Sequence, residues 1–173
     1  SACALAQRNA EENGLADSLH MYCMDVRDVK AHFPAESFSL VCCNPPYTEK
    51  GRGIPGASRS QYIARHETSA PLSDFVQAAV WLLPKGGRFC LVHRPSRLAD
   101  IFLRCRENAL EPKRLRFVQG RADKAPKLFL VEGKRGAKQG YMDVLPALIV
   151  EDERGFTEEM KRIYGSYKDG YDG

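Results

Sequence analysis

The sequence predicts an α/β fold with a mostly parallel sheet, and two observations carry this prediction. Short, largely apolar stretches such as Phe38–Cys43 and Arg88–Val92 alternate with stretches whose apolar residues recur at helical spacing, such as Leu72–Leu83. Parallel strands are covered by helices on both faces, so they lack the polar alternation of half-exposed strands. We therefore expect one domain over residues 1–173, with a mostly parallel sheet that carries an antiparallel strand at its edge.

The first part of the chain predicts a helix, a short strand and a second short helix. Ala2–Asn13 has helical spacing, and Gly14 is placed to end this helix in a left-handed conformation. Leu19–Met24 is short and mostly apolar, which favours a strand. Val26–Phe33 spaces its apolar residues like one face of a short helix, and Pro34 ends it.

The middle of the chain predicts a buried strand, a long loop and a helix. The strand covers Phe38–Cys43, and Thr48–Pro71 is a loop because Gly, Ser and Arg dominate it without sustained periodicity. Order returns at Leu72, where Ser73 or Asp74 is placed to cap a helix that ends before Pro84.

The last part of the chain predicts alternating strands and helices. Arg88–Val92 is a strand, and the helix that follows over Leu98–Ala109 ends before Pro112. Two strands at the sheet edge, one further strand and a terminal helix are expected at Leu115–Val118, Leu128–Val131, Ala147–Val150 and Thr157–Tyr167.

Composition favours a soluble, cytoplasmic protein. With 43% hydrophobic and 28% charged residues, the chain resembles an ordinary globular domain, and no stretch approaches the roughly 18 apolar residues of a membrane span. The six cysteines lie in apolar stretches without a Cys-X-X-Cys pair, so we expect reduced core thiols. The histidines show no ligand spacing, and neither a metal nor a catalytic histidine is predicted.

Positive charge is concentrated in one segment. The chain has a net charge of +4, but residues 111–140 contain nine Lys or Arg against three acidic residues, a local charge of +6. Such an asymmetry favours a polyanion partner, although a solvated surface without a partner has the same composition.

The turn Asn44-Pro45-Pro46-Tyr47 carries the clearest chemical signal. It follows the predicted strand Phe38–Cys43 directly, and the carboxyl ends of strands are where open α/β sheets bind ligands. Both prolines lack an N–H and stiffen the turn, which therefore offers mainly carbonyl acceptors. The alternative is that the prolines merely end a strand while Tyr47 packs in the core.

An acceptor turn of this kind suits a planar amino group. The Asn44 side-chain oxygen and the Pro45 carbonyl can each accept one N–H of an exocyclic amine, while Tyr47 offers a ring face to a base. Such contacts direct the nitrogen lone pair toward an electrophile, and the rate comes from positioning rather than from a strong base.

The motifs together resemble a known enzyme class over almost the whole chain. Ala6–Leu15, Asp25-Val26, the Asn-Pro-Pro-Tyr turn and Pro84–Arg88 resemble the amino-methyltransferases of the class I, Rossmann-like fold. Later segments resemble the bacterial tRNA(Val) adenine N6-methyltransferases, which modify adenine 37: Val92–Pro95, Arg97-Leu98, Glu111–Leu115 and Pro146–Val150. The resemblance implies S-adenosylmethionine as cofactor and methylation of adenine N6 in RNA, with tRNA adenine 37 as the expected target.

The resemblance also implies roles for individual residues. The family's acid that accepts from the cofactor's adenine corresponds to Asp25, with Val26 beside it. Asn44, Pro45 and Tyr47 take the catalytic places, Asn44 also borders the cofactor, and Pro46 contacts the substrate.

Two family features are not found in this sequence. The Gly-rich cofactor loop and the ribose-binding acid are expected before Ser1, so the chain is expected to be the C-terminal part of a methyltransferase domain that binds cofactor poorly alone. Gly51–Gly56 matches G-X-G-X-X-G but follows the turn instead of a strand, and we expect a substrate-side loop there. The candidate phosphate-binding residues are Arg52, Arg59, Arg65, Lys113 and Arg114.

Three other functions fit parts of the pattern. A protein glutamine N5-methyltransferase of the release-factor type also uses Asn-Pro-Pro-Tyr, and a ribosomal RNA amino-methyltransferase shares the fold. A non-enzymatic RNA-binding fragment is the third alternative. The sequence does not predict an oligomeric state.

Overall fold

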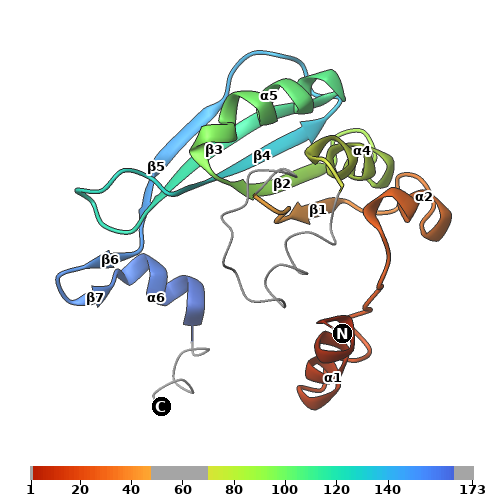
Figure 1. Ribbon diagram of the computed structural model, residues 1–173. Coiled ribbons are helices and arrows are strands. Elements are labelled where there is room, and N and C mark those ends of the chain that lie inside the picture. Colours follow the sequence, from red (N-terminus) through yellow and green to blue (C-terminus); the bar gives the residue numbers. More distant parts are fainter. Residues whose placement is uncertain (1, 48–69, 166–173) are drawn as a thin grey trace, which may run out of the picture.

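The computed structural model of the protein describes residues 2–47 and 70–165 and is centred on a five-stranded sheet (Figure 1). Its strands are β1 (Leu40–Cys43), β2 (Arg88–His93), β3 (Leu110–Gln119), β4 (Leu128–Arg135) and β5 (Asp143–Ile149). Their order in the sheet is β1-β2-β4-β3-β5. A separate two-stranded sheet pairs β6 (Glu151–Asp152) with β7 (Gly155–Phe156).

Four of the five strands run in the same direction. β1 pairs parallel with β2 and β3 pairs parallel with β5, whereas β4 is antiparallel to both β2 and β3. The predicted mostly parallel α/β sheet is therefore confirmed. The antiparallel strand was expected at the edge, but β4 lies between β2 and β3. A short connection from β3 makes β4 its antiparallel neighbour, and the other side of β4 pairs with β2.

Helices cover mainly one face of the sheet (Figure 1). The helices are α1 (Ala2–Glu12), the 3-10 turn η1 (Val26–Asp28), α2 (Val29–His32), α4 (Leu72–Leu82), the 3-10 turn η2 (Pro95–Arg97), α5 (Leu98–Glu107) and α6 (Glu158–Tyr164). Helices α4 and α5 pack on the sheet, while α1 lies apart from it. No helix within the described residues is long and apolar enough to cross a membrane.

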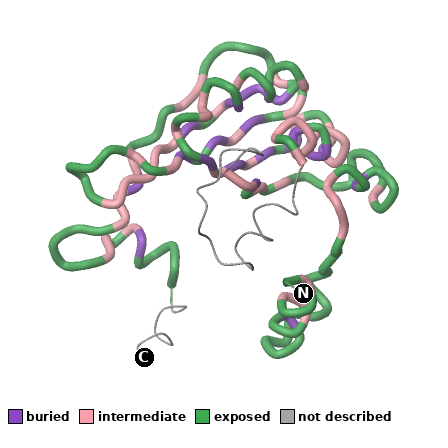
Figure 2. The backbone as a smooth tube through the Cα atoms, in the orientation of Figure 1, coloured by how far each residue is buried: buried purple, intermediate pink, exposed green. Residues whose placement is uncertain are grey.

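The core lies between the sheet and helices α4 and α5 (Figure 2). Strand β2 alternates, so that Phe89 and Leu91 are buried beneath the helices. Val131 lies beside Leu91 on β4. The helical spacing predicted for residues 72–83 is confirmed, because Val76, Ala79 and Leu83 are all fully buried.

The ends of three helices show where local sequence signals succeed and fail. At Gly14, with φ +67°, α1 ends as predicted, because the Gly14 and Leu15 N–H groups bond to the Glu11 and Ala10 carbonyls. Helix α4 was expected to be capped by Ser73 or Asp74, but Pro71 holds the N-cap position without a side-chain hydrogen bond. Helix α5 ends at Glu107, because Ala109 takes a left-handed φ of +57°.

Two predicted strands differ in the structure. Residues 19–24 form no strand, because a strand needs a neighbour for its backbone hydrogen bonds and this segment pairs with none among the described residues. The strand predicted as buried over Phe38–Cys43 is the shorter β1, which lies at the edge of the sheet. Leu40 is therefore 40% exposed. β3 begins at Leu110, so Pro112 lies inside a strand, at a bulge, where its missing N–H is tolerated.

The cysteines are less buried than predicted. Only Cys105 is buried, whereas Cys23 and Cys42 are exposed. The apolar stretches that contain those two residues are segment 19–24, which pairs with no described strand, and the edge strand β1, and this explains the difference.

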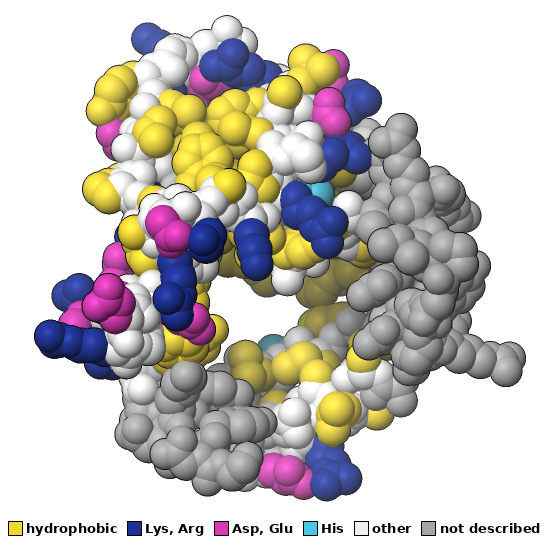
Figure 3. Space-filling view, turned by 60° about the vertical axis from the view of Figure 1, so that its left-hand side comes forward, with side chains coloured by type: hydrophobic (Ala, Val, Ile, Leu, Met, Phe, Trp, Pro, Cys, Tyr) yellow, Lys and Arg dark blue, Asp and Glu magenta, His cyan; other side chains and the backbone are white. Residues whose placement is uncertain are grey.

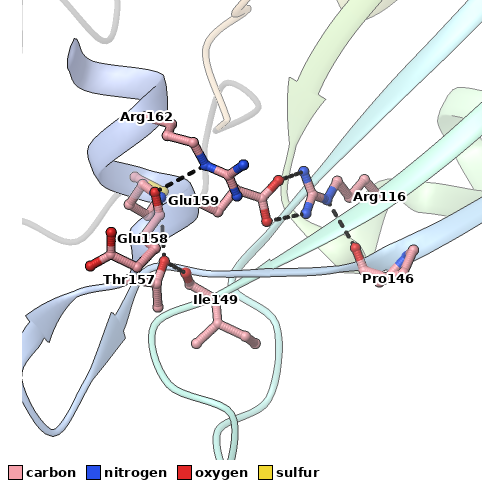
Figure 4. A network of polar contacts seen from close by, with 8 residues as sticks. Arg116, Pro146, Ile149, Thr157, Glu158, Glu159 and Arg162 are labelled. Carbon is pink, nitrogen blue, oxygen red and sulfur yellow. Dashed lines mark hydrogen bonds and ion pairs between the residues drawn. The ribbon is translucent and has the colours of Figure 1, made fainter.

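A polar network connects helix α6 to strands β3 and β5 (Figure 4). The Arg116 guanidinium on β3 donates to both carboxylate oxygens of Glu159, each at 2.7 Å, and to the Pro146 carbonyl at 2.9 Å. Thr157 caps α6 by accepting from the Met160 N–H, and its hydroxyl donates to the Ile149 carbonyl at 2.7 Å. The terminal helix predicted near Thr157 is thus confirmed over its described part.

We expect the attachment of α6 to depend on pH. The Arg116 hydrogen bonds hold the pKa of Glu159 in the folded protein below its ordinary value. The stabilisation by this contact is therefore fully present above the carboxyl pKa of the unfolded chain, and it is lost as the pH falls through the lower pKa of the folded protein. Because Glu159 is 42% exposed, solvent screens this ion pair, and Glu159→Gln should increase the opening of α6 only modestly at pH 7. Amide hydrogen exchange of α6 measures this, and the effect should disappear in acid.

Glu158→Gln is the matched control. Its carboxylate is 83% exposed and pairs with Lys161 on the same helix rather than with the sheet. Equal exchange in the Glu158 and Glu159 variants at pH 7 would contradict a role for the Arg116 contact.

Candidate functional site

The acceptor turn, Asn44–Tyr47, lies where two parallel strands end together. Strand β1 pairs with β2 so that Cys43 lies opposite Leu91, and β2 ends two residues later at His93. The turn therefore follows the carboxyl end of β1 beside the end of β2, as the sequence predicts. Within it Pro45 is buried, Pro46 and Tyr47 are half-buried, and Asn44 is exposed.

Side-chain contacts hold the acceptor turn together. The Tyr47 hydroxyl donates to the Asn44 side-chain oxygen at 2.8 Å. The Tyr47 ring also meets the His93 ring in an edge-on contact, with centroids 5.0 Å apart, and the Arg94 guanidinium lies over its face at 5.4 Å. Tyr47 is thus not simply a core residue, because its hydroxyl orients the amide that was predicted to meet the substrate.

Two ionisable groups next to the turn, His93 and Cys43, are held in their uncharged forms. Burial, and secondarily the charge of Arg97, lower the pKa of His93, whose Nδ1 accepts the Arg94 N–H at 2.9 Å. His93 is therefore neutral at pH 7 with its proton on Nε2. Burial raises the pKa of Cys43 to about 12, so this thiol stays protonated and is no nucleophile.

A pocket of about 680 Å³, here called the β1–α4 pocket, opens beside the free edge of β1. Most of its lining is apolar and comes from β1, α2, α4 and residues 18–26. Val26 and Asn44, both predicted to bind the cofactor, line it together. The Trp81 indole N–H donates to the Phe33 carbonyl at 2.9 Å, which ties α4 to α2 in the wall of this pocket.

Asp25, the third predicted cofactor residue, lies between the lining residues Met24 and Val26. Its carboxylate accepts the Arg27 N–H at 2.9 Å and two guanidinium N–H groups of Arg27 at 2.8 and 2.6 Å. These contacts hold its pKa near 2, so Asp25 is ionised and caps η1. Of about four acceptor positions on a carboxylate, one is left for another donor.

A second hollow of about 500 Å³ lies over the sheet face opposite α4 and α5, and we call it the open-face groove. Asn44 lines this groove as well, together with Arg114 from the predicted substrate-binding set. Figure 3 shows hydrophobic side chains gathered over the upper part of the molecule with Lys and Arg side chains around their margins. The structure therefore places Asn44 at the junction of the two hollows.

Much of the basic segment 111–140 is engaged within the protein. Lys113 donates to the Lys138 and Tyr141 carbonyls at 2.7 and 3.3 Å, while Arg114 is 4.0 Å from Glu132. Arg116 and Arg135 also pair with carboxylates. The local charge of +6 is thus a weaker indication of a polyanion partner than the sequence suggests.

Some predicted residues lie outside the described part of the chain. Arg52, Arg59, Arg65 and the Gly51–Gly56 segment belong to residues 48–69. Within the described ranges, no group of three or more His, Cys, Asp or Glu side chains is placed to hold a metal ion.

Sequence reasoning did not assign a role to His93 or Arg94, although both contact the acceptor turn. Their positions directly after the apolar residues of β2 are a usable signal, because adjacent parallel strands end at the same edge of a sheet.

Sequence comparison shows two methyltransferase relatives. The chain is 33% identical over 103 residues to a tRNA1(Val) (adenine(37)-N6)-methyltransferase of Dickeya chrysanthemi (strain Ech1591), covering 60% of this chain and 39% of that protein. It is 32% identical over 98 residues to the protein of the same name from Pectobacterium carotovorum subsp. carotovorum (strain PC1), covering 57% and 38%. The chain thus spans about two fifths of these relatives' length. No protein-family model matches it.

Solved structures share the architecture. A predicted O-methyltransferase from Agrobacterium tumefaciens superposes with a TM-score of 0.69 at 18% identity, covering 93% of this chain and 71% of that one. The geranyl diphosphate C-methyltransferase of Streptomyces coelicolor A3(2) gives a TM-score of 0.51 at 12% identity, covering 77% and 60%. At identities this low, the comparison concerns the fold alone. The superposition with the first structure establishes that the chain has the α/β fold of the class I methyltransferases.

Proposed function

We propose that the protein is an S-adenosylmethionine-dependent N-methyltransferase that acts on the exocyclic N6 of an adenine in RNA, and that residues 1–173 belong to a single methyltransferase domain. The observation that carries the proposal is the acceptor turn at the end of β1, in which Tyr47 orients the Asn44 amide oxygen at the junction of two hollows. The tRNA methyltransferase relatives support an RNA adenine as substrate, and tRNA adenine 37 is the specific target we propose.

The β1–α4 pocket fits part of an S-adenosylmethionine molecule. Its volume of about 680 Å³ is within the range of small-molecule sites, and an apolar lining with few polar groups suits an adenine ring. Val26 and Asn44 would border the cofactor, and the ionised Asp25 would accept from its adenine amino group through its remaining lone pair. The bound cofactor supplies an electrophilic methyl group.

The chain's own residues position the acceptor nitrogen. The Asn44 oxygen has two lone pairs, of which Tyr47 uses one, so the other is available to an adenine N–H. The Pro45 carbonyl would accept the second N–H, and Pro46 would lie against the base. Holding both hydrogens directs the nitrogen lone pair outward and stabilises the positive charge that develops there. No strong base is required, because the proton can leave to water after methyl transfer.

The proposal is tested by incubating the full-length protein with methyl-labelled S-adenosylmethionine and RNA that lacks modifications. We expect label in N6-methyladenosine, identified by nuclease digestion and mass spectrometry. A glutamine-containing release-factor peptide and ribosomal RNA serve as competing substrates. Label in the peptide or in a ribosomal RNA base would replace the proposed substrate, and label in none of them would leave only a binding function.

RNA binding is expected to depend on salt. If Lys113 and Arg114 contact phosphates, each removed contact should reduce the slope of log affinity against log salt by about 0.7–0.9. We therefore expect the Lys113→Glu, Arg114→Glu double variant to flatten the slope by about 1.5, measured by fluorescence anisotropy of labelled tRNA. Arg104→Glu is the control, because Arg104 is exposed on α5 and pairs with Glu107. Unchanged slopes would remove both residues from the proposed RNA surface.

A further inference from the structure

Arg94 follows β2 directly and has a rigid backbone. Its N–H donates to His93 Nδ1 at 2.9 Å, and the following Pro95 restricts it to the extended conformation observed, with φ −77° and ψ 141°. His93 is itself 4% exposed and packs against the Tyr47 ring. The start of the Arg94 side chain is thus held in a defined place beside the acceptor turn.

The guanidinium of Arg94 is placed over an aromatic ring, and no carboxylate of the described residues pairs with it. It lies 5.4 Å from the centroid of Tyr47, whose hydroxyl reaches the Asn44 oxygen. Most described arginines have an acidic partner within 4.0 Å, namely Arg8, Arg27, Arg88, Arg97, Arg104, Arg106, Arg114, Arg116 and Arg135. Among residues 2–47 and 70–165, no carboxylate pairs with Arg94, and its side chain is exposed.

An unpaired guanidinium held at a ligand site favours an anion. A guanidinium carries five N–H donors in a planar fork that matches the oxygens of a phosphate, and contact with an aromatic ring leaves the outer donors available. In a nucleic acid, the anion closest to a nucleobase is the phosphodiester of its own nucleotide. A guanidinium beside the acceptor turn is therefore placed to contact that phosphodiester when a base binds at the turn.

We propose that Arg94 binds a phosphate that flanks the target adenosine, while Tyr47 and Asn44 engage the base. This inference rests on the proposed function and adds a contact that selects a nucleotide within a polynucleotide over a free nucleoside. The acceptor turn then contacts the base, and Arg94 at the end of β2 contacts the RNA backbone next to that base.

The test compares RNA trinucleotides with a central adenosine in which either flanking phosphate is replaced by an uncharged methylphosphonate. Wild-type protein should bind the native trinucleotide about tenfold more tightly than one of the two replaced forms, as expected for one charge-assisted contact. The affinities of Arg94→Met for the native and replaced trinucleotides should lie within about twofold of each other. A double-mutant cycle of protein and RNA changes then isolates the coupling between Arg94 and the phosphate. Arg104→Met, with its exposed arginine on α5, should behave like wild type.

Three results would overturn the inference. These are equal affinity of the wild-type protein for all three trinucleotides, equal weakening of charged and uncharged forms by Arg94→Met, and no binding of the native trinucleotide at millimolar concentration. The second result would mean that Arg94 only supports Tyr47. Failure of the proposed function has a separate signature, which is the absence of methyl label in RNA, whereas the trinucleotide affinities are measured without methyl transfer.

Discussion

Replacing Asn44 with alanine is expected to lower the rate of methyl transfer by about two to three orders of magnitude, because one acceptor for the developing positive charge is lost. The amide oxygen is oriented by the Tyr47 hydroxyl at 2.8 Å and has one lone pair left for an adenine N–H. Cofactor affinity should change much less, since Asn44 forms only part of the β1–α4 pocket. Single-turnover methylation of RNA, with cofactor binding measured in parallel, separates these effects.

Tyr47 provides the matched control for Asn44. Tyr47→Phe removes the hydroxyl that orients Asn44 but keeps the acceptor oxygen of Asn44 and the ring against His93 and Arg94, so the rate should fall much less than in Asn44→Ala. Tyr47→Ala also removes the ring face, and stacking on an aromatic ring contributes about 1–3 kcal/mol per base. If Asn44→Ala methylates at the wild-type rate, the turn only ends strand β1. The enzymatic proposal would then lose its main support.

The largest effect on stability is expected at Phe89. Its side chain is fully buried at the centre of the core between the sheet and helices α4 and α5, and it lies opposite Val41 of β1. Phe89→Ala should lower the free energy of unfolding by about 3–5 kcal/mol, through lost burial and an unfilled cavity. Urea unfolding followed by circular dichroism measures this change.

Leu103 is the comparison for Phe89, because it lies on α5 with 55% of its surface exposed. Leu103→Ala should change the unfolding free energy by less than about 0.5 kcal/mol. Similar losses in the two variants would contradict the core described for this fold.

Local sequence signals were sufficient wherever backbone geometry or periodicity decides the structure. Gly14 ends α1, Thr157 begins α6, and the apolar spacing of residues 72–83 places α4 on the sheet. These features depend on positive φ, on a side-chain cap or on one helix face, all of which involve residues close together in sequence.

The sequence by itself determined the α/β class and the stiff acceptor turn after β1, because prolines and apolar runs act through local geometry. Only the tertiary structure decided that β4 lies inside the sheet, that β1 forms its edge, and that residues 19–24 pair with no strand of the described residues. It also decided that His93 and Arg94 meet Tyr47, and that many basic side chains are satisfied by carboxylates or carbonyls. Strand order and side-chain partners depend on which distant segments pair, and no local pattern encodes that choice.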